Sequence, residues 1–149
     1  MVYLFFYDEN VDIVEKGEFS LDKLDTLLSE RLANSKLPFE SAEKTISLTH
    51  FSLYRNEKDG GQVKDCIEVD ALHNGLFKIE SEKLYPFLQN HKSKSGLFGK
   101  LTNLFSSSNH YNGCEVDLLT AKTILTDYVL LDRQSFENKN EQILWKKVK

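Results

Sequence analysis

The chain has 149 residues, of which 40% are hydrophobic and 28% charged, and its formal net charge at pH 7 is −4. This length is sufficient for one domain with a substantial core, and the composition excludes an intrinsically disordered chain. No apolar run approaches the roughly 18 residues of a membrane span, and the short apolar start lacks the basic flank of a signal peptide. We therefore expect a cytoplasmic protein without a membrane span.

The first part of the chain predicts a strand followed by an acidic surface connection. Residues 2–7 are a continuous run of aromatic and aliphatic side chains, which predicts a central strand buried on both faces. Residues 8–18 are polar and acidic, and they predict a surface loop. Residues 1–43 hold ten acidic and four basic side chains, whereas the remainder holds thirteen and fifteen. The negative charge is therefore concentrated near the N-terminus.

Residues 20–34 show the pattern of an amphipathic helix. Ser20 is a favourable N-cap, and Phe19 before it can pack against Leu24 as a hydrophobic staple. Asn34 is a suitable residue to end the helix, and Pro38 prevents it from resuming nearby. Leucines spaced by three and four residues predict one apolar stripe that faces the core. They are Leu21, Leu24, Leu28 and Leu32.

Residues 45–80 predict a three-stranded antiparallel meander. Apolar and polar residues alternate, and Asn74-Gly75 is a favourable pair for a tight turn. In the first strand the alternation changes phase near His50, which predicts either a β-bulge or a strand that is covered on both faces. The strands are expected at about 45–55, 63–70 and 76–80, with turns at 59–61 and 74–75.

The next segment differs in composition from the rest. Residues 81–91 predict a short helix that starts with Pro86 in its first turn. Residues 92–113 are rich in serine and asparagine at both ends, and they predict a flexible or lid-like insertion. Within it, residues 97–105 have an amphipathic helical pattern. This element can pack on its own domain, dock into a groove of a partner, or touch a membrane surface.

The C-terminal part predicts one more helix and an element of undecided type. Residues 117–131 carry apolar side chains at helical spacing, with Asp117 as N-cap, although their threonines also permit a strand. Residues 142–149 contain several apolar side chains without a clear periodicity. Together these elements predict an α+β fold in one domain, 1–149. The N-terminal strand and the meander would form a mixed or antiparallel sheet, packed against several helices.

Motifs for metal, nucleotide or cofactor binding are absent from the sequence. The histidines occur singly, and neither cysteine belongs to a catalytic or zinc-binding pattern. Two cysteines in a chain of this length predict reduced thiols rather than a disulfide framework. We therefore expect no cofactor and no metal, and a protein that is not an enzyme. The alternative is a small enzyme whose site assembles from distant residues, with Cys66, Cys114, His50, His73, His91 and His110 as candidates.

A second alternative is weak binding of single-stranded RNA. Basic and aromatic side chains alternate in residues 91–111, an arrangement that can stack nucleobases and contact phosphates. The negative charge of the chain opposes this interpretation, since it repels phosphates.

The interpretation we favour is a non-enzymatic domain that binds another protein through its acidic N-terminal third. Acidic domains of this size without catalytic motifs are similar, as a class, to bacterial immunity proteins, which neutralise a toxin by covering its active site. A basic toxin would be attracted to an acidic surface. We expect the interface to consist of acidic residues of the first segment. They are Asp8, Glu9, Asp12, Glu15 and Glu18, extended by Asp22 and Asp25.

Overall fold

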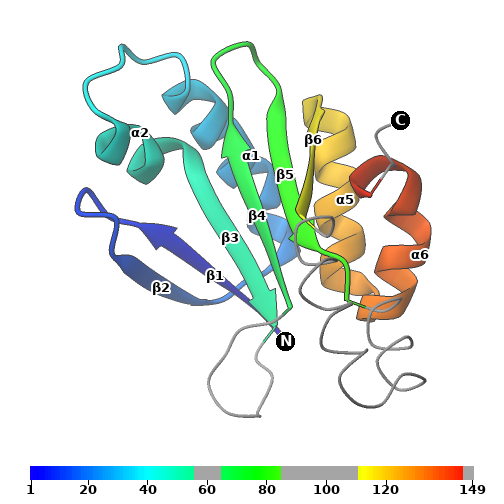
Figure 1. Ribbon diagram of the computed structural model, residues 1–149. Helices are drawn as coiled ribbons and strands as arrows, with labels where there is room; N and C mark the ends of the chain where they lie inside the picture. The colour runs from blue at the N-terminus through cyan, green and yellow to red at the C-terminus, as the bar shows by residue number, and fades with distance from the viewer. Residues whose placement is uncertain (56–64, 85–110, 146–149) are drawn as a thin grey trace, which may run out of the picture.

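The computed structural model describes residues 1–55, 65–84 and 111–145, and it shows an α+β fold (Figure 1). Six strands form one sheet in the order β2-β1-β3-β4-β5-β6, and every neighbouring pair is antiparallel. The strands are β1 (Val2–Tyr7), β2 (Ile13–Glu18), β3 (His50–Arg55), β4 (Cys66–Ala71), β5 (Phe77–Glu82) and β6 (Tyr111–Val116). The helices are the 3-10 helix η1 (Leu21–Lys23) and the α-helices α1 (Leu24–Asn34), α2 (Ala42–Thr49), α5 (Leu118–Leu130) and α6 (Arg133–Leu144).

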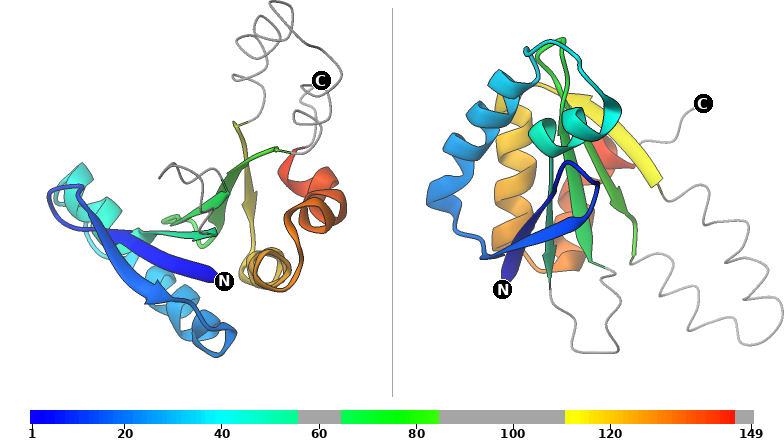
Figure 2. Two further views of the ribbon diagram at one scale, coloured as in Figure 1. Left: turned by 90° about the horizontal axis from the view of Figure 1, so that it is seen from below. Right: turned by 90° about the vertical axis from the view of Figure 1, so that its left-hand side faces the viewer.

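The helices α1, α5 and α6 lie on one side of the sheet, whereas α2 lies across the end where β3 begins (Figures 1 and 2). The core forms between the sheet and these three helices. Apolar side chains of alternate strand positions meet the buried faces of the helices there. The fully buried side chains include Leu28, Phe51, Leu53, Ile67, Phe77, Ile79, Leu125, Tyr128 and Phe136.

The expected loop at 8–18 is wrong, because its second half is the edge strand β2. Asp8 closes the turn that precedes this strand, and its carboxylate accepts hydrogen bonds from the backbone amides of Asn10 and Asp12, at 2.8 and 3.0 Å. An edge strand pairs on one side only, so its side chains can stay polar and exposed. The sequence of β2 therefore lacks the apolar alternation by which strands are recognised.

The strand β1 is confirmed, but it is not buried evenly on both faces. Val2 and Phe5 are buried, while the other side chains of the strand are half-buried. It lies between β2 and β3, one position from the edge of the sheet. The predicted helix over 20–34 is confirmed as well, except that its first turn is the 3-10 helix η1 and the Ser20 side chain makes no capping hydrogen bond.

The meander is confirmed in its antiparallel pairing and corrected in its bounds. Residues expected at the start of the first strand form helix α2, which Ser41 caps by accepting a hydrogen bond from the amide of Lys44 at 3.1 Å. The change of phase near His50 is therefore the junction of a helix and a strand, not a bulge, and the alternative of a strand covered on both faces is confirmed for β3, whose first five side chains are all buried. The turn at 74–75 is present, with Gly75 at φ 88°, where a glycine is favoured. The turn expected at 59–61 lies outside the described residues.

The C-terminal half contains one confirmed helix and one that the sequence did not predict. Helix α5 begins after Asp117, whose carboxylate accepts a hydrogen bond from the amide of Thr120 at 2.8 Å. Helix α6 has a polar sequence, so its two buried apolar residues, Phe136 and Leu144, gave too weak a periodicity. Leu144 and Trp145, in the segment of undecided type, close the core at the end of α6.

The segment between β5 and β6 is described only at its ends. Residues 81–82 continue β5, and the helix expected to start with Pro86 in its first turn lies outside the described residues. Residues 111–113 belong to β6, so the insertion expected at 92–113 ends earlier. The amphipathic element at 97–105 lies outside the described residues. None of the described helices has the length and apolar character needed to cross a bilayer.

Candidate functional site

The register of the sheet assigns each strand residue to one of two faces, because successive side chains point to opposite sides. Buried Leu53, Ile67 and Ile79 mark the side on which the helices lie. The opposite side combines aromatic rings with carboxylates, and we call it the aromatic–acidic face. It comprises Tyr3, Phe5, Tyr7, Glu15, Glu18, His50, Ser52, Tyr54, Cys66, Glu68, Asp70, Lys78, Glu80 and Glu115.

A row of aromatic rings runs along β1 and β3 on this face. Tyr3 and Tyr54 are directly opposite in the ladder and stack with their ring centroids 5.5 Å apart. Phe5 lies 5.4 Å from Tyr54 and 6.1 Å from Tyr7, and Tyr7 lies 4.9 Å from the imidazole of His50. Aromatic side chains are enriched in protein interfaces because each ring buries a large, rigid area.

Carboxylates flank the aromatic row on both sides. Glu15 of β2 accepts a hydrogen bond from the Tyr54 hydroxyl at 3.1 Å, and Asp70 of β4 lies 3.0 Å from Nδ1 of His50. Nearby carboxylates also raise the pKa values of two tyrosine hydroxyls on this face. The pKa of Tyr7 is raised by burial and by Glu68 and Asp70, and the pKa of Tyr54 is raised by burial and by Glu15.

Positive charge is distributed in the opposite way. All three arginines of the chain, Arg31, Arg55 and Arg133, lie against the helix side of the sheet, where each guanidinium packs on an aromatic ring. On the aromatic–acidic face, Lys78 is the one lysine or arginine within the described ranges, and its ammonium pairs with Glu80 at 2.8 Å. Among the described residues this face therefore carries more negative than positive charge.

The seven acidic residues expected at an interface are not on one surface. Glu15 and Glu18 point to the aromatic–acidic face, and Glu9 and Asp12 are exposed in the β1–β2 turn beside it. The carboxylate of Asp8 is engaged in closing that turn. The remaining two, Asp22 and Asp25, lie on η1 and α1, and Asp25 pairs with Lys122 of α5 at 2.8 Å.

Sequence reasoning missed most of this face. Glu68, Asp70, Glu80 and Glu115 lie far from the acidic N-terminal segment in sequence and become its neighbours only in the sheet. One signal was present, since Cys66 and Glu68 alternate with the apolar positions of their strand. The tyrosines of β1 gave no such signal, because a strand of six apolar and aromatic residues does not indicate which side is covered.

The cysteines and histidines proposed for an enzyme are not brought together by the described chain. Cys66 lies on the aromatic–acidic face and Cys114 on the helix side, so the sheet separates the two thiols, and neither forms a disulfide. Burial raises the pKa of Cys66 to about 12 and that of Cys114 to about 11, which disfavours the nucleophilic thiolate. His50 is paired with Asp70 in the ladder, and Cys66 is paired with Tyr54. The Ser52–Glu68 pair lies between these two pairs on the same face.

The other two histidines proposed, His91 and His110, lie outside the described residues, as do residues 91–110 of the expected RNA-binding segment. His73 is in the β4–β5 turn, with Nδ1 3.0 Å from the backbone oxygen of Ser35. Within the described ranges, no three His, Cys, Asp or Glu side chains are grouped closely enough to hold a metal ion.

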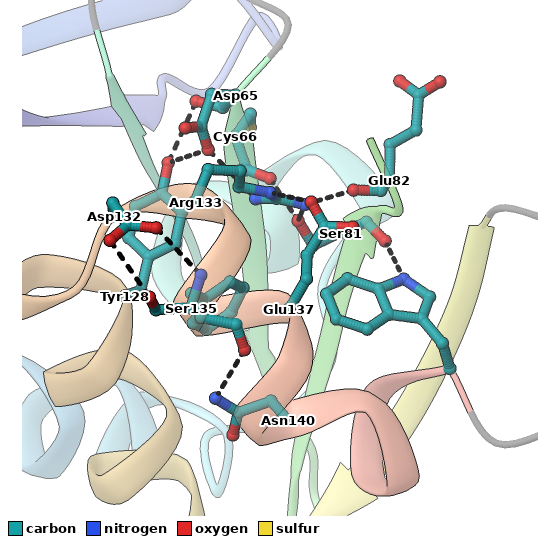
Figure 3. Close-up of polar contacts among 12 residues, drawn as sticks. Asp65, Cys66, Ser81, Glu82, Tyr128, Asp132, Arg133, Ser135, Glu137 and Asn140 are labelled. Atoms are coloured by element: carbon teal, nitrogen blue, oxygen red, sulfur yellow. Dashed lines mark hydrogen bonds and ion pairs between the residues drawn. The ribbon is translucent and has the colours of Figure 1, made fainter. Parts of the chain in front are cut away.

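A buried cluster of charges lies where α6 begins (Figure 3). Arg133 pairs with Asp65 at 3.0 Å and with Glu137 at 2.9 Å, and it donates to the hydroxyl of Ser81 at 3.0 Å. Tyr128 donates to the Asp65 carboxylate at 3.0 Å, and burial together with this charge raises the pKa of its hydroxyl. Sequence reasoning did not identify the cluster, because its members come from four separate elements.

The cluster joins elements rather than presenting reactive groups. The two acidic side chains and Arg133 are each at most 5% exposed, so a substrate has no access to them. Arg55 extends the network by donating to the backbone oxygens of Tyr128 and Leu131, and the Trp145 indole donates to the backbone oxygen of Ser81 at 2.9 Å. We interpret it as the contact that fixes the α5–α6 corner against β4 and β5.

A hollow of about 680 Å³ lies between the α1–α2 loop and the β4–β5 turn. Leu37 and Phe39 are exposed at its rim, and Ile46, Leu48 and Leu72 are among the side chains that line it. Its polar lining is mixed in sign, with Lys36 and Lys78 as well as Asp70. This mixture does not indicate the chemistry of a ligand.

Comparison of the chain with protein-family models, with curated proteins and with solved structures found no significant match.

Proposed function

We propose that the protein is a non-enzymatic binding domain, and that its aromatic–acidic face binds a basic protein. One observation carries the proposal: carboxylates from four strands, β2, β4, β5 and β6, converge on a face that also holds a row of aromatic rings. The only described lysine there is already paired. Such a surface attracts cations over a long range and offers large rings for contact at close range.

The charge distribution supports a protein partner over a nucleic acid. Phosphates would meet Glu15, Glu18 and Asp70 around the same rings that nucleobases would need for stacking. Lysine and arginine side chains would meet attractive charge at those positions. Electrostatic complementarity of this kind mainly increases the rate of association and selects against acidic partners.

The finer part of the proposal is that the partner is a toxin, which the domain neutralises in the way of bacterial immunity proteins. Toxins that cleave nucleic acid need a basic surface to hold the phosphates of their substrate. An acidic face of this kind would compete with that substrate for the same surface. This part of the proposal depends on the class similarity drawn from the sequence and on the charge of the face.

The test is affinity capture from host lysate with three forms of the full chain. The first is the wild type, and the second is the double variant Glu15→Gln/Glu18→Gln. The matched control is Asp22→Asn/Asp25→Asn, which changes the net charge equally but away from the face. We expect a basic protein that the wild type and the control retain at low salt and that the double variant loses. Equal retention by all three forms would contradict the proposed surface.

If a basic protein is captured, the finer part is tested by its activity. A toxin should kill or arrest cells when it is expressed alone, and co-expression of the wild-type chain should restore growth. Restoration by the double variant to the same extent would show that neutralisation does not use this face.

A further inference from the structure

We infer that the partner presents an arginine, and that its side chain lies across the stacked rings of Tyr3 and Tyr54 with its guanidinium between the carboxylates of Glu15 and Glu18. This inference depends on the proposed function and names the chemical group that its surface recognises. The four residues form one subsite at the β2 edge of the aromatic–acidic face, and we call it the arginine subsite.

The geometry of β2 produces the pair of carboxylates. Glu15 and Glu18 are three residues apart, which in a regular strand would place them on opposite faces. The ladder shifts register between Leu4 and Phe5, so that Glu15 lies opposite Phe5 and Glu18 opposite Tyr3. The bulge therefore places both carboxylates on one face. Their partners on β1 are two residues apart, which corresponds to a backbone separation of roughly 7 Å.

The aromatic half of the subsite is held in place by the chain itself. The Tyr3 and Tyr54 rings are 5.5 Å apart with an interplanar angle of 27°, and the Tyr54 hydroxyl donates to Glu15. Tyr54 is 8% exposed and serves as the floor, while Tyr3 is half-buried and exposes part of its ring. A flat cation can therefore contact a ring and a carboxylate at the same time.

The opposite side of the same strand shows how this fold holds a cation against a ring. Phe6 of β1 faces the helix side, where the guanidinium of Arg31 lies 4.2 Å from its ring centroid and the ammonium of Lys16 lies 5.8 Å away. Arg31 also donates to the backbone oxygen of Ser47 at 2.8 Å. In the described part of the chain, no lysine or arginine occupies that position over Tyr3 or Tyr54. A cation from another molecule would complete the same arrangement.

The chemistry of the subsite favours arginine over lysine. A guanidinium is planar, so it stacks on a ring, and its five N–H groups can reach two carboxylates in different directions. A lysine ammonium is a compact, strongly hydrated charge that gains less from a ring face. The subsite should therefore distinguish the two cations, whereas a merely negative surface would not.

The experiment uses two short peptides of identical sequence except that one carries arginines where the other carries lysines. Binding to the full-length wild-type chain is measured by calorimetry at low salt. We expect the arginine peptide to bind about two to five times more tightly, the preference that a cation–π contact at an exposed site provides. Tyr3→Leu should remove this preference, and Glu15→Gln/Glu18→Gln should weaken the arginine peptide by up to about tenfold.

The controls separate the failure of the subsite from the failure of the proposed function. Asp22→Asn/Asp25→Asn should leave the affinity for the arginine peptide within about twofold of the wild type, since these charges are screened from the face. The fluorescence of Trp145, which is buried on the helix side, reports that each variant is folded. Equal affinity for both peptides would overturn the arginine subsite and leave the proposed function standing. If neither peptide binds, or if a single-stranded RNA binds more tightly than both, the proposed function is overturned as well.

Discussion

The two sides of the sheet are built on different principles. On the helix side, the three arginines are enclosed by the chain's own carboxylates, backbone oxygens and aromatic rings. On the aromatic–acidic face, carboxylates flank a row of rings and, among the described residues, the only arginine or lysine is the paired Lys78. This comparison is the reason for proposing that the aromatic–acidic face binds a cationic partner.

Substitutions on the two sides of the sheet should therefore have different effects, on stability on the helix side and on binding on the aromatic–acidic face. Groups on the helix side are buried with their partners, so removing one of them leaves the others without compensation. The acidic groups at the β2 edge are exposed, so changing them should alter binding and leave the fold intact. Five predictions test this separation, beginning with the largest expected effect.

Replacing Arg133 should cause the largest loss of stability. Arg133→Met would remove the closer cation of buried Asp65, which would keep Arg55 Nε at 3.7 Å, and would break the ion pair of buried Glu137. We expect the free energy of unfolding to fall by about 3–5 kcal/mol, the usual cost of breaking a buried ion pair. Urea unfolding measures this. The control is Lys122→Met, which removes an exposed partner of Asp25 and should cost less than about 1 kcal/mol. Similar losses in both variants would show that the cluster is not a structural contact.

Neighbouring residues of β4 offer a direct comparison of the two sides. Ile67 is fully buried on the helix side, and Cys66 is half-buried on the aromatic–acidic face. Ile67→Ala should cost about 2–5 kcal/mol, because it leaves a cavity in the core. Cys66→Ala should cost at most about 1 kcal/mol. Both are measured by urea unfolding, and a reversed order would mean that the faces have been assigned wrongly.

The cysteines should make stability depend on pH only in the alkaline range. Burial raises the pKa of Cys66 from 9.0 to about 12, so the thiol ionises more readily in the unfolded chain. Below pH 9 both states are protonated and this thiol contributes no pH dependence; as the pH rises from 9 towards about 12, the unfolded state is favoured and stability falls. The alkaline loss of stability should be smaller in Cys66→Ala than in the wild type.

The same raised pKa predicts slow alkylation. At neutral pH, iodoacetamide should label Cys66 and Cys114 of the folded protein much more slowly than those of the urea-unfolded chain. Mass spectrometry of the labelled peptides measures both sites. Fast labelling of Cys66 in the folded protein would favour the enzyme alternative.

Neutralising the β2 carboxylates should have the smallest effect on stability. Glutamine keeps an oxygen that can accept the hydrogen bond of the Tyr54 hydroxyl, so Glu15→Gln/Glu18→Gln should change the free energy of unfolding by less than about 0.5 kcal/mol. Urea unfolding in parallel with the peptide titrations checks this. A loss comparable to that of Arg133→Met would place these residues in the fold rather than at an interface.

Part of this molecule was determined by local sequence. The hydrophobic run of β1, the leucine stripe of α1 and the capping Asp117 of α5 are short-range signals, and each produced the expected element. The alternation of β4 correctly placed Ile67 and Val69 on the opposite face from Cys66 and Glu68. These signals need no knowledge of distant residues, because side-chain periodicity and capping act within a few positions.

The rest was decided by tertiary structure. Strand β2 exists because β1 offers it an edge, and the bulge that brings Glu15 and Glu18 to one face is set by their pairing. The buried charges around Arg133 are tolerated only because distant elements supply every partner. The sequence alone shows which charged and aromatic residues are present. It does not show which of them become neighbours, since strand order and register are long-range properties. For this reason the acidic segment was recognised from the sequence, and the aromatic row that it borders was not.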